Sequence, residues 1–332
     1  MKKFVAILLT LMLVLGIGAA VAEGTETPTT PSKSEAKTFN FKKTYTTTAG
    51  AAPATVPAET LAFEVVAKQG NPDNTMITIA DHSVNGSTQS IVVSVPSYTM
   101  VGKWNYTISE KAGNTKGVTY ATTQFDVQVF VAYNEAGTAL VSTTSFTTHK
   151  AGSETDKVDE IVNNYDLGGL TVKKEVSGNL ASKTQKFDID VTFTSDKPVR
   201  STISGAATIN SSDWKESAEG GYTYTTTISL AANEDATFSN IPAGVHYTVV
   251  EQAKHAEADG NGSNPSKGYT VGYVGDKGNI AADTTASATV KNTKEKDMDM
   301  GVTTENLPYV LLIGFVVLAG AALLIKRKAH NN

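Results

Sequence analysis

Lysine, glutamate and asparagine recur at matched places in the two halves of this 332-residue chain, and together these side chains can form an amide bond. Each lies within a run of alternating apolar residues, on the apolar face. The two sets are Lys43, Glu110 and Asn163, and then Lys174, Glu251 and Asn292. Lysine and asparagine are 120 positions apart in the first set and 118 apart in the second.

An apolar environment changes the chemistry of these side chains. Burial lowers the pKa of a lysine amine, which can then be neutral and nucleophilic. The same environment raises the pKa of a carboxyl group, so a glutamate can hydrogen-bond the carboxamide oxygen, polarise its carbon and shuttle protons. Attack of the amine on the asparagine would release ammonia and leave a Lys–Asn isopeptide bond. Folding would supply the proximity that this reaction needs.

Two simpler interpretations stay open for each set taken alone. Lysine and glutamate could form a buried ion pair with a hydrogen bond to asparagine, because buried charges need partners. Alternatively, these strand ends could be exposed to solvent and the pattern accidental. The repetition of the set at matched landmarks favours the chemical interpretation.

Period-two alternation predicts that β-strands position all six residues. The strands carrying the first set read "FNFKKTY", "KWNYTISE" and "EIVNNY", and those carrying the second read "LTVKKEV", "GVHYTVVE" and "ATVKNT". Between them lie other short runs rich in Val, Ile, Thr, Tyr and Phe, separated by turn residues. This pattern predicts an all-β chain of antiparallel β-sandwiches.

The order of the matching strands predicts two tandem domains, at 37–166 and 167–296. The short stretch "YDLGG" between them suggests that the domains sit end to end. A linker rich in Pro, Ser and Thr, at 23–36, precedes them.

Composition excludes several functions. The net charge is −5 and no basic region dominates, so we expect no nucleic-acid partner. The five histidines lack metal-ligand spacing, and no hydrolase, metalloprotease or phosphate-loop motif occurs, so we expect no metal, no cofactor and no enzyme. Cysteine is absent, so a secreted form would have to be stable without disulfides.

Both ends carry targeting signals. Residues 1–22 read as a secretory signal peptide cut after Ala22, the alternative being a retained membrane anchor. Within the segment 297–332, an apolar run at about 307–325 is long enough to span a bilayer. The basic residues after it belong on the cytoplasmic side, so the mature chain would lie outside the cell.

The strand motifs "FNFKK" and "LTVKK", "YTISE" and "YTVVE", and "IVNNY" and "TVKNT" give the chain its resemblance to a known family. It resembles the tandem Ig-like major pilins of Gram-positive bacteria, including the streptococcal backbone pilin and Cna-B-type modules, over essentially the whole mature chain. The resemblance implies two Ig-like sandwiches, each with its first strand bonded to its last. Lys43 would join Asn163 with Glu110 as catalyst, and Lys174 would join Asn292 with Glu251 as catalyst.

The same resemblance implies assembly by a sortase. The stretch "GVTTENLPYV" resembles the segment after the cleavage site in this family, which makes Met300–Gly301 the expected cut. "DMDM" precedes it and no LPxTG motif is present, which leaves a permanently membrane-anchored protein as an alternative. Lys157 is the first choice for the lysine that joins the next subunit and Lys150 the second, unless they are ordinary surface lysines. Lys103 and Lys116 are further options.

The sequence therefore predicts the shaft subunit of a covalent pilus at the cell wall. Its partners would be identical subunits and a sortase, with accessory pilins and host surface ligands as further candidates. The alternative is a wall- or membrane-anchored adhesin built from the same modules. Each bond would stabilise its module by roughly 4–5 kcal/mol in the chain-entropy model. The glutamates would act once, on their own chain, so the protein would not be an enzyme.

Overall fold

The computed structural model describes residues 33–149, 160–252 and 268–295. Within these ranges the chain is all β, apart from one short 3₁₀ turn, η1 (Ser211–Asp213). None of the described residues forms a helix that could cross a membrane. The signal peptide, the segment predicted to span the membrane, the cleavage candidates Met300 and Gly301, and the joining candidates Lys150 and Lys157 all lie outside the described residues.

The first module is a sandwich of two main sheets. One sheet has the order β4 (Thr78–Ile79), β6 (Thr88–Val95), β1 (Lys37–Thr46), β11 (Glu160–Tyr165) and β8 (Val118–Thr119). The other has the order β10 (Leu140–His149), β9 (Gln124–Tyr133), β7 (Gly102–Glu110) and β3 (Phe63–Ala67). A small ladder pairs β2 (Thr60–Leu61) with β5 (His82–Ser83).

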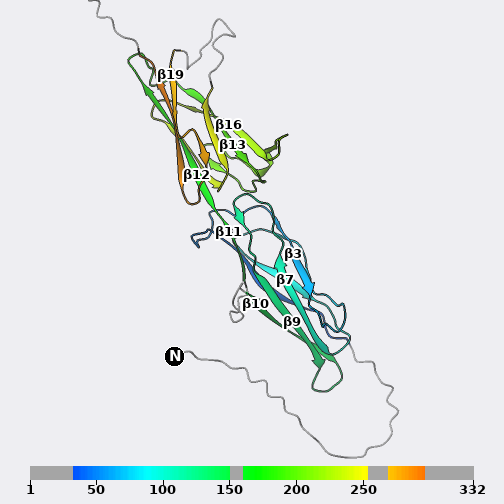
Figure 1. The fold of residues 1–332 in the computed structure, drawn as a ribbon. Coiled ribbons are helices and arrows are strands. Elements are labelled where there is room, and N and C mark those ends of the chain that lie inside the picture. Colours follow the sequence, from blue (N-terminus) through cyan, green and yellow to red (C-terminus); the bar gives the residue numbers. More distant parts are fainter. Residues whose placement is uncertain (1–32, 150–159, 253–267, 296–332) are drawn as a thin grey trace, which may run out of the picture.

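The second module is also a sandwich, and it lies end to end with the first (Figure 1). Its first sheet has the order β14 (Ser204–Gly205), β17 (Asp235–Pro242), β12 (Leu167–Ser177), β21 (Thr285–Thr293) and β19 (Thr270–Val274). Its second has the order β15 (Lys215–Glu216), β16 (Tyr222–Leu230), β13 (Phe187–Ser195), β18 (His246–Glu251) and β20 (Lys277–Asn279).

In both modules the first strand and the last strand are parallel neighbours. β1 pairs with β11, and β12 pairs with β21. Such a pair needs a long connection, and here the connection is nearly the whole module. The pairing brings together residues that are more than a hundred positions apart in sequence.

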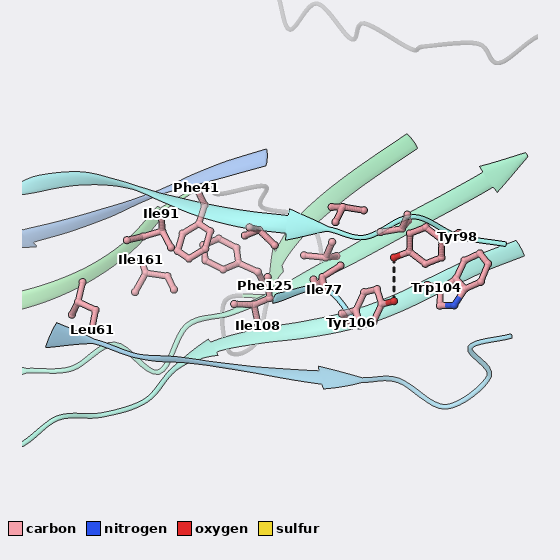
Figure 2. Packing of buried hydrophobic residues seen from close by; sticks show 14 of the residues in the cluster. Phe41, Leu61, Ile77, Ile91, Tyr98, Trp104, Tyr106, Ile108, Phe125 and Ile161 are labelled. Atoms are coloured by element: carbon pink, nitrogen blue, oxygen red, sulfur yellow. Dashed lines mark hydrogen bonds between the residues drawn. The ribbon is translucent and has the colours of Figure 1, made fainter. Parts of the chain in front are cut away.

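The core of the first module fills the space between its sheets. Figure 2 shows Phe41 and Ile91 from one sheet facing Phe125 and Ile108 from the other. All four are almost fully buried, and the Phe41 and Phe125 rings lie 4.9 Å apart between centroids. Alternation along the strands puts these side chains inside, and burial of each stabilises the fold by about 1.5–3 kcal/mol.

The two modules differ in the sheet that carries the glutamate. In the first module β7 lies between β3 and the long hairpin β9–β10. In the second module β18 lies between β13 and the three-residue strand β20, and β13 forms a long antiparallel ladder with β16, although β14, η1 and β15 lie between these two strands in the chain. The two modules therefore match in the pairing of their first and last strands, as the sequence repeat suggests, but differ in the sheet that carries the glutamate.

Several contacts fix the junction between the modules. The Ala58 N–H donates to the Arg200 carbonyl over 2.6 Å, and the Lys116 amine pairs with the Asp196 carboxylate, also at 2.6 Å. Gly117 has a positive φ of 81°, and a Cβ there would lie 2.9 Å from Pro242. Glycine is therefore required where this loop of the first module meets the second module.

Candidate isopeptide sites

The six residues singled out from the sequence form one buried set in each module. Lys43 and Asn163 are completely buried, and Glu110 is 8% exposed. Lys174, Glu251 and Asn292 are at most 5% exposed. The interpretation that these strand ends are exposed is therefore wrong.

Strand register explains how lysine meets asparagine. In the first module Lys43 is paired with Ile161 and Tyr45 with Asn163, so Lys43 and Asn163 are two positions apart across the parallel ladder. In the second module Lys174 is paired with Val290, two positions before Asn292. A two-residue offset keeps both side chains on the same face, toward the core. The last residue of β7 or β18, a glutamate, reaches across from the opposite sheet.

In the first module Glu110 contacts both partners. One of its oxygens lies 3.0 Å from the Lys43 amine, without hydrogen-bond geometry, and the other accepts a hydrogen bond of 2.8 Å from the Asn163 amide nitrogen. The Asn163 oxygen accepts a 2.8 Å hydrogen bond from the Ala121 backbone N–H. Since a backbone N–H can only donate, this contact fixes which end of the carboxamide faces Glu110.

Burial shifts the pKa of both charged groups in this site. Desolvation lowers the pKa of Lys43 to about 8, although the neighbouring Glu110 opposes the shift. Desolvation likewise raises the pKa of Glu110, against the influence of Lys43. Both shifts favour the neutral amine and the neutral acid, which are the forms that the chemistry requires.

The second site has the same members in a tighter arrangement. The Lys174 amine donates a 2.5 Å hydrogen bond to one Glu251 oxygen, and the Asn292 amide nitrogen donates one of 2.8 Å to the other. The Lys174 amine also lies 4.4 Å from the centre of the Phe187 ring. Desolvation lowers the pKa of Lys174. The buried Asn292 oxygen has no hydrogen-bond partner among the described residues.

The neighbouring lysines differ in environment. Lys42 and Lys173, each one residue before a buried lysine, point to the outer face and are exposed. Of the further joining candidates, Lys103 is exposed, whereas Lys116 is mostly buried in its ion pair with Asp196. The described residues contain no group of His, Asp and Glu side chains able to hold a metal ion.

The sites differ from the sequence interpretation in one detail. We expected the glutamate to hydrogen-bond the carboxamide oxygen, but in both sites it accepts from the carboxamide nitrogen. The reason in the first module is that the Ala121 N–H occupies the oxygen. The glutamate therefore faces the atom that would leave as ammonia.

Sequence reasoning missed a second buried carboxylate in the first module. Glu59, 8% exposed, accepts hydrogen bonds from the hydroxyls of Tyr45, Thr115 and Tyr120. It precedes the two-residue strand β2 in a segment without alternation, so periodicity gave no signal for it.

Two family models match this chain, one over each module. Residues 25–166 match the family model described as the Spy0128-like isopeptide containing domain (FctA). Residues 168–294 match a different model, a domain of unknown function (DUF7601). The two models fall on the two modules, which differ in their second sheets.

A curated protein named pilin, from Streptococcus pyogenes serotype M1, is 28% identical over 275 residues, which is 78% of each chain. The chain is a relative of the Gram-positive backbone pilins. Among solved structures, this pilin relative matches the major pilin protein (T3.2) from Streptococcus pyogenes with a TM-score of 0.50 and 19% identity. The match covers 79% of this chain and 99% of the other, and it supports the tandem β-sandwich fold. A second major pilin of that species matches with a TM-score of 0.48 and 20% identity, over 78% and 99% of the two chains.

Proposed function

We propose that this protein is the shaft subunit of a covalently assembled pilus on a Gram-positive cell, with each module closed by its own Lys–Asn bond. The bonds join Lys43 to Asn163 and Lys174 to Asn292. The observation that carries the proposal is the repeated placement of a buried lysine and asparagine on the parallel first and last strands, bridged by one glutamate.

The reaction balances without any outside reagent. The neutral lysine amine attacks the asparagine carboxamide carbon, and an N–C bond forms. Glu110, or Glu251 in the second module, starts as the neutral acid, gives its proton to the departing amide nitrogen and takes up the proton that the amine loses. The C–N bond to that nitrogen breaks, ammonia leaves, and the glutamate ends in its original state.

Each bond would act as a disulfide does in other secreted proteins. Closing a loop of about 120 residues stabilises a module by about 5 kcal/mol in the chain-entropy model. An amide does not respond to reducing agents. The bond would also remove the buried lysine's charge, which is costly to keep away from water.

Assembly would depend on residues outside the described ranges. We propose export by the signal at 1–22, temporary anchoring by 307–325, sortase cleavage at Met300–Gly301, and transfer to Lys157 or Lys150 of the next subunit. The partners are then identical subunits and the sortase. The ion pair with Asp196 makes Lys116 a poorer acceptor than an exposed lysine.

Intact-mass spectrometry of the full chain tests the bonds. Each one releases an ammonia of about 17 Da, so the mass should fall about 34 Da below the sequence mass. Lys43→Ala or Lys174→Ala should halve the loss, whereas the matched controls Lys42→Ala and Lys173→Ala should leave it unchanged. An unaltered wild-type mass would refute both bonds.

Immunoblotting of cell-wall extracts tests the polymer. A ladder of bands that survives boiling in detergent is expected, and Lys157→Ala should collapse it if Lys157 is the acceptor, with Lys150→Ala as the comparison. A single band from the wild-type chain would instead favour an anchored surface protein.

A further inference from the structure

The segment between β7 and β9, residues 111–123, contains the short strand β8 and contacts the first site at the Asn163 side chain. Its Ala121 N–H donates to the Asn163 carboxamide oxygen over 2.8 Å. When the Lys43 amine adds to the carboxamide carbon, that oxygen takes on negative charge. A donor already aimed at an oxygen of this kind stabilises the developing charge without reorganisation.

Glu59 binds the same segment, residues 111–123, through hydrogen bonds. It accepts hydrogen bonds of 2.5 Å each from the Thr115 and Tyr120 hydroxyls, and the Thr115 N–H also donates to the Tyr120 hydroxyl. Tyr120 immediately precedes Ala121. The loop is therefore tied by two hydroxyls to one buried carboxylate, at the residue next to the donor.

Glu59 is also linked to the reacting strands. The Tyr45 hydroxyl donates to its other oxygen, and Tyr45 is the register partner of Asn163. The Lys43 amine lies 5.0 Å from the centre of the Tyr45 ring. One carboxylate thus ties the loop that supplies the donor to the strand that supplies the nucleophile.

We infer that the Ala121 N–H is the oxyanion donor for bond formation in the first module and that Glu59 is the positioning residue that holds it there. This inference rests on the proposed isopeptide reaction. It assigns the first module a component that the described part of the second module lacks, since the buried Asn292 oxygen has no partner there.

The charge of Glu59 has a separate effect on the site. Burial is the main cause of the raised pKa of Glu110, and the negative charge of Glu59 adds to it. The same charge opposes the lowering of the pKa of Lys43. Removing the charge should therefore move the pH profile of the reaction toward lower pH, whereas a purely structural role would leave the profile in place.

The test follows bond formation in each module of the full chain during cell-free synthesis. Samples are quenched at intervals and digested, and the cross-linked peptides containing Lys43–Asn163 and Lys174–Asn292 are quantified by mass spectrometry. The second module is an internal reference in every sample.

Ala121→Pro removes the N–H donor and should slow formation of the Lys43–Asn163 bond by a factor of about 10²–10³, the range for loss of one oxyanion donor. The control Ala121→Gly keeps the N–H, so its bond should form at the wild-type rate. Tyr120→Phe removes one hydroxyl, and Gly113→Ala places a methyl group against that hydroxyl. Each of these two variants, and Glu59→Gln as a third, should slow bond formation in the first module by about tenfold, a fraction of the full donor effect.

Thermal melting of the same substitutions in a Glu110→Ala background, where no bond forms, checks that the first module is folded at the assay temperature. The inference is overturned if Glu59→Gln and Tyr120→Phe leave the rate of a folded first module unchanged, if they slow both modules equally, or if the pH profile of Glu59→Gln does not move. If the wild-type chain forms no cross-link in either module, the proposed reaction itself is wrong.

Discussion

The two modules place the same three types of side chain, lysine, glutamate and asparagine, in different surroundings. In the first, the Asn163 oxygen accepts a hydrogen bond from a backbone N–H, and a second buried carboxylate, Glu59, binds the segment that carries this N–H. The Lys43 amine lies close to Glu110 but without hydrogen-bond geometry. In the second, Lys174 makes a 2.5 Å hydrogen bond to Glu251 and the Asn292 oxygen is unpartnered among the described residues. Under the proposed reaction, the shared triad would supply the reacting groups in both modules, and its surroundings would set how fast each module reacts.

The largest expected effect comes from removing, one at a time, the two glutamates proposed to be catalytic. Glu110→Ala should destabilise the first module by at least about 5 kcal/mol, because the loop is no longer closed and the buried Lys43 loses its partner. Glu251→Ala should do the same to the second module. Differential scanning calorimetry should show one transition falling in each variant while the other stays in place. A uniform fall of both transitions would contradict independent closure of the modules.

A pH titration of unreacted variants separates the two lysine environments. Asn163→Ala keeps Lys43 and Glu110 but cannot form the bond. The pKa of Lys43 is about 8 in the folded chain and 10.5 in the unfolded chain, so between these values the unfolded chain binds more protons and stability rises with pH.

The rise should be on the order of 1 kcal/mol per pH unit above pH 8, measured by chemical denaturation. The control, Lys43→Met with Asn163→Ala, should lack it. Asn292→Ala should show a smaller rise in the second module, because the hydrogen bond to Glu251 favours the charged form of Lys174. A flat profile in Asn163→Ala would mean that Lys43 stays charged when buried.

Glu59→Gln should lower the stability of the first module alone. The substitution weakens acceptance from three buried or partly buried hydroxyls, which costs about 1–3 kcal/mol. Urea denaturation of the Glu110→Ala background measures it without interference from the bond. An equal loss in the second module would show that Glu59 acts through the junction.

The smallest effect is expected at the junction itself. Asp196→Asn removes the ion pair with Lys116, but Asp196 is 67% exposed, and exposed pairs contribute about 0–1 kcal/mol. Both calorimetric transitions should move by no more than about 4 °C at this small energy change. A clear shift in both would mean that the modules unfold as one unit.

Sequence alone was sufficient for the residues that alternate along regular strands. Lys43, Glu110 and Asn163 share strand faces with large apolar residues. Because side chains alternate between the two faces of a strand, this pattern predicts that all three are buried. The pairing of first and last strands came from family resemblance, since alternation does not say which strands are neighbours. The differing second sheets were missed because short strands such as β20 leave almost no pattern.

The surroundings of the sites could not be predicted for a different reason. Glu59 and Thr115 lie in irregular segments, where position depends on long-range contacts and not on a local period. The Ala121 donor is a backbone group, and every residue but proline carries one. Only the fold shows which N–H points at the Asn163 oxygen.

The placement of β11 and β12 has a mechanical consequence. β11 ends at Tyr165 and β12 begins at Leu167, so one nearly continuous segment runs from the first module into the second. With both bonds in place, a covalent route would pass from β1 to β11, along β12, and across to β21. The roughly 120 residues between Lys43 and Asn163, which could span about 400 Å if drawn straight, would add no length under load. A fibre of such subunits would be close to inextensible.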